Sequence, residues 1–337
     1  MNNFNKIPIH DSSLRHSTGQ AVYIDDMPEQ ENLLHAAPIL SKIACGKIIN
    51  INSDKLNNLP FFTKVITAKD IPGENEIGPI KNGEPVLADD YISYLGQPIG
   101  IVLAETHQEA IYATSLVEIE TEITTKPILN LDDAYKQKSF LENPMILEKG
   151  NVENDMAKSN YKLSGNFEIG GQDHFYLETH VAMTFPGEND EYVVWSSTQH
   201  PTEVQHGVGK VLNIPSAKID SKVRRLGGGF GGKESQATIF AAMSALGAYV
   251  TQKPVKIRLN RHNDMTASGK RHNFKVYFTV GFTAAGKLLA LDIKLLSNGG
   301  NVLDLSGPVM TRALTHLDNC YFIKSLKAVG YVCKTNT

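Results

Sequence analysis

Residues 223–236 read V-R-R-L-G-G-G-F-G-G-K-E-S-Q, and the rest of the chain is best understood from this stretch. The residues from about Ala217 to Val223 predict a strand, and the small and apolar residues from Ser235 to Tyr249 predict a helix. Glycines between the two elements let the backbone adopt positive φ angles and come close to a ligand. Because the first turn of a helix leaves N–H groups unpaired, the loop is expected to bind an anionic or oxo-bearing group.

A phosphate loop is the first alternative for this stretch. From Gly227 the spacing G-x-x-x-x-G-K matches the phosphate loop of nucleotide hydrolases as far as Lys233. The following residue of such a loop is Ser or Thr, because its hydroxyl holds the magnesium ion. Here it is Glu234, whose carboxylate would repel phosphate oxygens. The sequence therefore argues against nucleotide hydrolysis and leaves a ligand-binding loop or a merely structural glycine turn.

Length and composition indicate an ordinary globular protein. The 337 residues are enough for two domains, each with its own core. Hydrophobic residues make up 41% and charged residues 20%, which is typical of folded domains. A formal net charge of -3 gives no electrostatic case for nucleic acid or for an acidic membrane as a partner.

The cysteines and the apolar runs restrict the cofactors and the compartment. Cys45, Cys320 and Cys333 are isolated, so we expect neither a zinc ribbon nor an iron–sulfur cluster held by this chain alone. A sparse, odd count also fits a reducing compartment. The first residues lack a basic start followed by an apolar run, and no stretch approaches the roughly 18 apolar residues of a membrane span. We therefore expect a cytoplasmic protein.

The pattern of strands and helices predicts two α+β units. Residues 1–130 read as short strands with a few helices, residues 131–158 as an exposed, mixed-charge connection, and residues 159–337 as the second unit. In the second unit we predict strands at 161–169, 175–185 and 192–196, a helix at 201–212, a hairpin of 274–282 with 288–298, and a helix at 306–317.

At 227–234 the run G-G-G-F-G-G-K-E resembles the molybdenum-cofactor loop of the xanthine dehydrogenase and aldehyde oxidase family, the molybdenum hydroxylases. Further similar motifs follow the family order along nearly the whole chain, at 19–26, 170–179, 196–199 and 312–321. The resemblance implies a small α/β hammerhead domain followed by the first part of a mixed α/β molybdenum-cofactor-binding domain.

Glu234 and Gln199 are the main site candidates. From the residues alone, Glu234 could stabilise a helix N-terminus and Gln199 could cap the helix that follows it. The resemblance implies instead that Glu234 hydrogen-bonds the purine ring, as the matching glutamate does in xanthine dehydrogenases. Aldehyde oxidases tend to lack this glutamate. It also implies that the amide of Gln199 donates to an oxo ligand of molybdenum without adding charge.

The same resemblance places Gly229, Phe230, Gly231 and Gln172 against the cofactor. The N–H groups of Phe230 and Gly231 would face an oxygen ligand of the metal, although Phe230 could also be an ordinary core side chain. Gln172, in the run G-G-Q-D-H-F-Y-L-E-T with His174, is expected to line the same cavity. In this family a pyranopterin dithiolene holds molybdenum, so Gln199 and Phe230 would lie beside the metal rather than bind it directly.

This sequence departs from the family pattern in two places. Residues 269–273 read G-K-R-H-N where the family has G-G-R-H-P. Family members also continue beyond the position of Thr337 into a second cofactor-binding domain that supplies the glutamate base, a substrate-binding arginine and most pterin contacts. We therefore expect a C-terminally shortened large subunit, with no catalytic base within these residues.

The expected function is hydroxylation of hypoxanthine or xanthine to urate with an oxygen atom taken from water. Electrons would pass through 2Fe-2S clusters and FAD to NAD, all carried by partner chains or domains of a hetero-oligomer. Two alternatives stay open. One is a molybdenum hydroxylase for aldehydes or other N-heterocycles, and the other is a non-catalytic fragment that only binds partner subunits.

Overall fold

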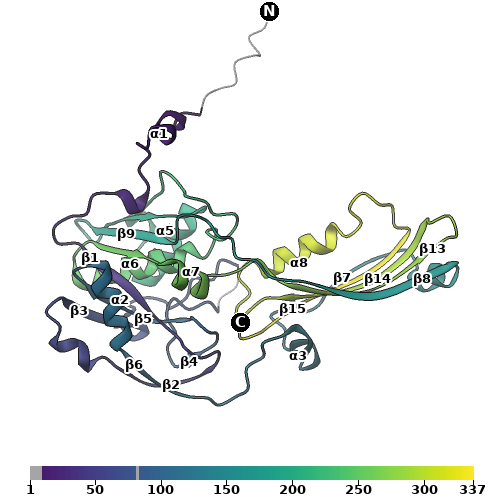
Figure 1. Cartoon of the computed structure of the whole chain (residues 1–337), viewed down its shortest axis with the longest axis horizontal. Coiled ribbons are helices and arrows are strands. Elements are labelled where there is room, and N and C mark those ends of the chain that lie inside the picture. The colour runs from purple at the N-terminus through teal and green to yellow at the C-terminus, as the bar shows by residue number, and fades with distance from the viewer. Residues whose placement is uncertain (1–9, 81–82) are drawn as a thin grey trace, which may run out of the picture.

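A seven-stranded mixed sheet forms the main body of the computed structural model, which describes residues 10–80 and 83–337 (Figure 1). Its strands, in spatial order, are β11 (Ile219–Lys222), β10 (Tyr192–Ser196), β9 (Val181–Pro186), β12 (Val255–Arg258), β1 (Leu34–Leu40), β5 (Pro98–Ala104) and β3 (Phe62–Thr67). β1 and β12 pair in parallel, with Leu34 opposite Val255. Strands from both predicted units therefore share one sheet.

Helices cover both faces of this sheet. Along β1 successive side chains point to opposite faces, so Leu34 and Ala36 join the large core under α5 (Pro201–Leu212) and α6 (Ala237–Thr251). Ala37 and Ile39 face the other side, where α2 (His107–Leu116) packs on β1 and β5. α6 is buried along most of its length because its small residues allow close approach to β9 and β12.

Two smaller sheets complete the fold. The three-stranded sheet has the order β4 (Tyr91–Ile92), β2 (Gly46–Asn52), β6 (Glu118–Glu122). The five-stranded sheet has the order β7 (Met145–Lys149), β15 (Ser325–Cys333), β14 (Leu288–Asn298), β13 (Phe274–Phe282), β8 (Tyr161–Ile169), and it extends from the main body as an arm (Figure 1). α8 (Ser306–Thr315) packs on β15 and β7, and α3 (Leu131–Lys136) and α4 (Val152–Ala157) pack on β14.

Short helices connect these layers. They are α1 (Ser13–Ser17), α7 (Arg261–Ala267) and the 3₁₀ turns η1 (Ile24–Asp26), η2 (Asp54–Asn58), η3 (Ala68–Asp70) and η4 (Ser216–Lys218). Among the described residues, no helix has the length and apolar character that crossing a bilayer requires.

The α+β prediction is confirmed, as are the helix at 201–212 and the hairpin of 274–282 with 288–298. Other boundaries differ. The strand expected at 175–185 begins at Val181, and the helix after the glycine loop begins at Ala237. The predicted connection, 131–158, contains α3, α4 and β7, and β7 pairs with β15. The division into units at 130 and 158 stays a prediction.

A cluster of charges attaches the N-terminal segment to the main sheet. The ammonium group of Lys256 on β12 is almost buried and lies 2.9 Å from Asp25 Oδ1 and 2.9 Å from Glu29 Oε1. Arg258 donates to Asp25 Oδ2 at 2.7 Å. Burial raises the pKa of Asp25 and of Glu29, but hydrogen bonds from Lys256, and for Asp25 also from Arg258, bring both below their ordinary values of 3.8 and 4.5.

Replacing Lys256 by methionine is expected to lower the free energy of unfolding by about 1–2 kcal/mol at pH 7, because two partly exposed carboxylates each lose one of their cationic partners. Since both pKa values are lowered by folding, the stability from these carboxylates is present above pH 4.5 and is lost as the pH falls below 3.8. Urea unfolding at pH 7 and at pH 3 measures this, and the deficit of Lys256→Met should be smaller at pH 3. An equal deficit at both values would contradict it.

Candidate functional site

The glycine loop lies between the end of β11 at Lys222 and the start of α6 at Ala237. Gly228 and Gly231 have φ angles of 95° and 96°, and Phe230 between them has a φ of 55° although it carries a side chain. The ring of Phe230 is 76% exposed. Phe230 is therefore not a core side chain: the loop holds it outward in a conformation that non-glycine residues rarely adopt.

The glycines of this loop approach side chains of the same chain. A Cβ atom at Gly227 would lie 2.3 Å from Cβ of Glu178, and one at Gly232 would lie 2.6 Å from Nδ1 of His174. These contacts come from residues 174–178, which run along the loop. We expected the missing Cβ atoms to make room for a ligand, but at these positions they make room for this neighbouring segment. Gly231 alone among the loop glycines faces open space, with His174 Nε2 at 3.9 Å as its nearest neighbour.

The amide of Gln199 is held in one orientation by this loop. Its Oε1 accepts hydrogen bonds from the backbone N–H groups of Gly231 at 3.0 Å and of Lys233 at 3.2 Å. Because both partners are donors, the oxygen has to face them and Nε2 has to face the other way. Within 10–80 and 83–337, Nε2 makes no hydrogen bond and is thus an unused donor beside the loop.

This arrangement changes the expected role of Gly231. Its N–H group was predicted to face an oxygen ligand of the metal, but it donates to Gln199. The N–H group of Phe230 has no such partner within the described residues. The donors without a partner among the described residues at this loop therefore include the amide nitrogen of Gln199 and the N–H group of Phe230.

The buried position of Lys233 excludes a phosphate-binding role for this loop. Its ammonium group is fully buried and donates to the backbone oxygen of Glu178 and to Oγ of Ser197, both at 2.7 Å. A phosphate-binding lysine has to reach its ligand from the loop. This lysine points into the protein instead, so it is part of the support beneath the loop.

Glu234 is exposed and borders an open cavity of about 540 Å³, lined also by His200, Glu203 and His206. His200 Nδ1 lies 2.7 Å from Glu203 Oε2. Burial raises the pKa of Glu203, and the carboxylates of Asp304 and Glu234 act in the same direction. Because α6 begins three residues later, Glu234 lies outside the helix, and its role as a first-turn stabiliser is not supported.

A buried carboxyl group, Glu84, and a half-buried one, Asp304, contact Gln236, which follows the loop. Nε2 of Gln236 donates to Glu84 Oε1 at 2.8 Å and to Asp304 Oδ2 at 3.4 Å. Burial raises the pKa of Glu84 to about 8, with a further contribution from Asp304. Burial therefore favours the protonated form of Glu84.

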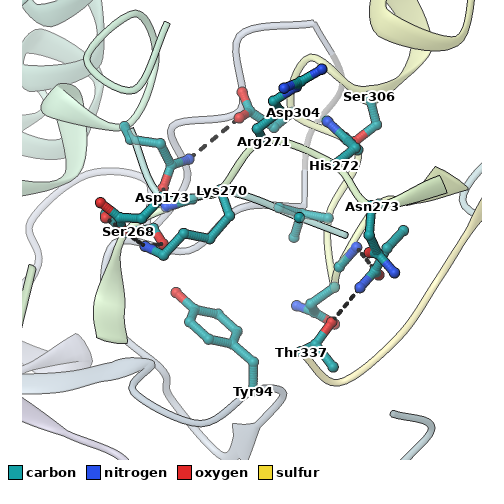
Figure 2. A pocket seen from close by; sticks show the side chains of 18 of the residues that line it. Tyr94, Asp173, Ser268, Lys270, Arg271, His272, Asn273, Asp304, Ser306 and Thr337 are labelled. Carbon is teal, nitrogen blue, oxygen red and sulfur yellow. Dashed lines mark hydrogen bonds and ion pairs between the residues drawn. The ribbon is translucent and has the colours of Figure 1, made fainter. Parts of the chain in front are cut away.

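Gln172 does not join the loop. Its Oε1 accepts a hydrogen bond from the guanidinium group of Arg271, and the backbones of the two residues pair with each other. Gln172 borders a different cavity, of about 500 Å³, which Lys270, Arg271, Asp173 and Tyr94 surround (Figure 2). The structure thus brings together Gln199, Gly229, Phe230 and Gly231, places Glu234 just beyond them, and separates Gln172.

Sequence reasoning did not predict which residues support the loop. They are His174, which was expected only to line the cavity, Lys233, which was compared with the lysine of a phosphate loop, and Tyr176 and Glu178. Their signal is an alternation: Phe175 and Leu177 are 67% and 92% exposed, whereas the residues on either side of them face the loop. An alternation with a period of two is typical of an extended segment, although Phe175 itself has a φ angle of 48°. That it packs on a loop fifty residues later could not be read from the pattern.

The residues present fit a molybdenum–pyranopterin group. An unused amide donor and an open glycine face suit oxo and anionic oxygens, which accept hydrogen bonds and have no need of a charged partner. Among the described residues there is no group of three His, Cys, Asp or Glu side chains arranged to hold a metal ion.

Comparison with known proteins gives two domain matches. A family described as "Molybdopterin cofactor-binding domain" matches residues 135–337, and one described as "Aldehyde oxidase and xanthine dehydrogenase, a/b hammerhead domain" matches residues 18–124. The expected hammerhead and cofactor-binding folds are therefore both confirmed.

Relatives and solved structures agree with these matches. Over 97% of this chain, xanthine dehydrogenase/oxidase of Gallus gallus is 41% identical and nicotinate hydroxylase hnxS of Emericella nidulans is 40% identical. The chain spans about a quarter of each relative, 24% and 25%. Aldehyde oxidoreductase from Desulfovibrio gigas superposes with a TM-score of 0.89 at 22% identity, covering 97% of this chain and 38% of that one. Quinoline 2-oxidoreductase from Pseudomonas putida 86 gives 0.88 at 20%, covering 98% and 44%.

Proposed function

Because this chain belongs to the xanthine dehydrogenase and aldehyde oxidase family of molybdenum hydroxylases, we propose that it is part of the molybdenum-binding subunit of a xanthine dehydrogenase. The reaction is hydroxylation of hypoxanthine and xanthine to urate. The observation that carries this proposal is the fixed amide of Gln199, whose Nε2 is free beside a loop that ends next to Glu234.

In this proposal each residue has one task. When bound, the molybdenum–pyranopterin supplies the chemistry that transfers an oxygen atom from water and takes up two electrons. Nε2 of Gln199 donates a hydrogen bond to an oxo group, and the backbone from Gly229 to Gly231 lies against the cofactor. The carboxylate of Glu234 accepts a hydrogen bond from an N–H group of the purine and so orients the ring. Gln172 has no assigned task in this proposal, because it borders a different cavity.

The proposal assigns the remaining parts of the enzyme to partners. The glutamate base belongs to a domain other than these residues, and 2Fe-2S, FAD and NAD are held by partner chains or domains of a hetero-oligomer. We also propose that the enzyme works in the cytoplasm, that residues 1–130 form the hammerhead domain, and that residues 159–337 form the first part of the cofactor domain.

A second candidate is hydroxylation of another N-heterocycle. The nicotinate hydroxylase relative is as similar to this chain as several xanthine dehydrogenases are. A pyridine carboxylate is an anion, and it would meet the carboxylates of Glu234 and Glu203 in the same cavity. This repulsion favours the purine, which offers neutral N–H donors.

The first test is the molybdenum content of the 337-residue chain purified from a host that makes the cofactor, with a full-length relative prepared in parallel. Near-stoichiometric metal would support cofactor binding by these residues. Metal in the relative alone would support the alternative that this chain binds partner subunits without holding cofactor.

Replacing Glu234 by valine in the holoenzyme is expected to lower kcat/KM for xanthine about 100-fold, because the purine loses a charged hydrogen-bond acceptor. Glu234→Gln, which keeps an acceptor oxygen, should lose much less. Steady-state kinetics with xanthine and nicotinate measure both effects. Unchanged xanthine turnover in Glu234→Val, or a loss confined to nicotinate, would refute the purine assignment.

A further inference from the structure

Buried charges lie beneath the glycine loop, outside the residues that would contact a ligand. The Lys233 side chain is 0% exposed, and its ammonium group has three acceptors. They are the backbone oxygen of Glu178 at 2.7 Å, Oγ of Ser197 at 2.7 Å and Oε2 of Glu178 at 3.4 Å. The ring of Tyr176 lies below it, with its centroid 4.6 Å from Nζ. An ammonium group buried in this way is held in one position.

Glu178 connects the same lysine to the start of the loop. Its Oε2 accepts from Oγ of Ser197 at 2.6 Å and from the backbone N–H of Gly227 at 2.8 Å. The backbone N–H of Glu178 donates in turn to the carbonyl oxygen of Gly227 at 3.1 Å. Gly227 is the first glycine of the loop and Lys233 follows the last, so one buried ion pair joins both ends.

Lys233 also holds Gln199 through its own backbone. Its N–H group donates to Oε1 of Gln199 at 3.2 Å, and its carbonyl oxygen accepts from the backbone N–H of Gln199 at 2.8 Å. Ser197, two residues before Gln199, is bonded to both members of the ion pair. A shift of Lys233 would therefore move the amide of Gln199 directly.

We propose that Lys233 and Glu178 are a positioning pair that fixes the glycine loop and, through it, the direction in which Nε2 of Gln199 points. Neither side chain contacts a ligand, since Lys233 is buried and Glu178 is almost buried beneath the loop. The pair acts by preorganisation, because a donor held in place spends no free energy on ordering when the ligand binds. The role of Gln199 rests on the proposed function, but the ordering of the loop does not.

The charges explain why single substitutions should have large effects. Burial lowers the pKa of Lys233, and the nearby carboxylate of Glu178 opposes that shift. Removing one member leaves the other as a buried charge without its partner, which costs more than removing both. Oε1 of Glu178 has no hydrogen bond within the described residues. A glutamine at 178 could therefore place its NH2 group there and keep every bond that Oε2 accepts.

Amide hydrogen exchange in the 337-residue chain without cofactor tests the pair. In Lys233→Met and in Glu178→Ala, exchange across 227–236 is expected to be at least about tenfold faster than in the wild type. Glu178→Gln should accelerate exchange less than Glu178→Ala does, because the acceptor bonds are kept although the charge is lost. Lys256→Met is the matched control: it removes another buried lysine that pairs with two carboxylates, Asp25 and Glu29, which lie outside the loop. It should leave exchange across 227–236 unchanged.

The outcomes separate positioning from general stability and from cofactor binding. The proposal would be overturned if the loop amides of Lys233→Met and Glu178→Ala exchanged at the wild-type rate. It would also be overturned if Lys256→Met accelerated loop exchange as much as these two variants do. If Lys233→Met does not fold, the contrast between Glu178→Ala and Glu178→Gln decides. Molybdenum content is the second readout, with at least tenfold less metal expected in Lys233→Met. Fast exchange with no metal even in the wild type would leave the positioning pair standing and count against the proposed function.

Discussion

Replacing Gly229 by alanine is expected to lower the molybdenum content of the chain at least about tenfold. A Cβ atom at Gly229 would lie 2.5 Å from Oε1 and 2.8 Å from Cδ of Gln199. Contacts this short force a movement, and the backbone of Gly229 is held between Gly228 and Phe230, both of which have positive φ angles. The amide of Gln199 would therefore move and lose its two hydrogen bonds.

The prediction separates orientation from stability. The loss of two hydrogen bonds at a partly exposed amide should cost about 1–3 kcal/mol of unfolding free energy, which a domain of this size tolerates. In contrast, the cofactor is expected to be retained poorly, because Nε2 of Gln199 no longer points toward it. Metal analysis and thermal unfolding of the same preparation measure the two effects.

Gly170→Ala is the control for this substitution. A Cβ atom at Gly170 would meet nothing within 4 Å, and its φ angle is not in the positive range. It lies near the start of the segment that supports the loop, yet alanine there should leave the metal content unchanged. A normal metal content in Gly229→Ala would show that Gln199 does not depend on the close contact.

Local patterns in the sequence predicted the elements whose contacts are close along the chain. The hairpin of β13 and β14 was predicted to the residue, because two apolar strands flank a short turn at 283–287. The helix α5 was predicted as well, with Pro201 in its first turn. The glycine loop was found from its own residues, whereas Gln199 was named a cofactor contact only through the resemblance to the family.

Contacts between distant segments could not be read in this way. The parallel pairing of β1 with β12 joins residues more than two hundred positions apart, and no periodicity reports it. The mixed charges of 131–158 indicated an exposed connection, yet β7 within it completes the five-stranded sheet as an edge strand, where polar residues are common. The spacing of the glycines made Lys233 look like the lysine of a phosphate loop. Its burial could not be predicted, because Glu178 and Ser197, which bind it, are brought to it only by the fold.

A second large effect is expected from Asp264, a buried residue on α7 that supports the segment beneath the loop. Its Oδ1 accepts from the hydroxyl of Tyr176 at 2.7 Å, and its Oδ2 accepts from the backbone N–H of His180 at 2.6 Å. Asp264 is 1% exposed and Tyr176 2% exposed. Burial and the neighbouring Asp264 carboxylate both raise the pKa of Tyr176, so its hydroxyl stays protonated and donates.

Asp264→Ala is expected to lower the free energy of unfolding by about 3–5 kcal/mol, because a buried hydroxyl and a buried N–H group each lose an acceptor. Asp264→Asn should cost less than half as much, since the amide keeps one acceptor oxygen and the hydroxyl of Tyr176 can turn to accept from its NH2 group. Denaturant unfolding of both variants and of Tyr176→Phe gives the coupling between the two side chains.

The effect should reach the glycine loop through Tyr176. Cβ of Tyr176 lies 3.0 Å from the position of a Cβ atom at Gly228, and its ring lies beneath the ammonium group of Lys233. Once Tyr176 loses its anchor, exchange of the loop amides should rise more than exchange in β13 and β14, which belong to the separate five-stranded sheet. A loss of unfolding free energy below about 1 kcal/mol would show that Asp264 does not hold the segment in place, because an acceptor shared by two buried donors cannot be removed at so small a cost. An increase of exchange that is equal in the loop and in β13 and β14 would show the same.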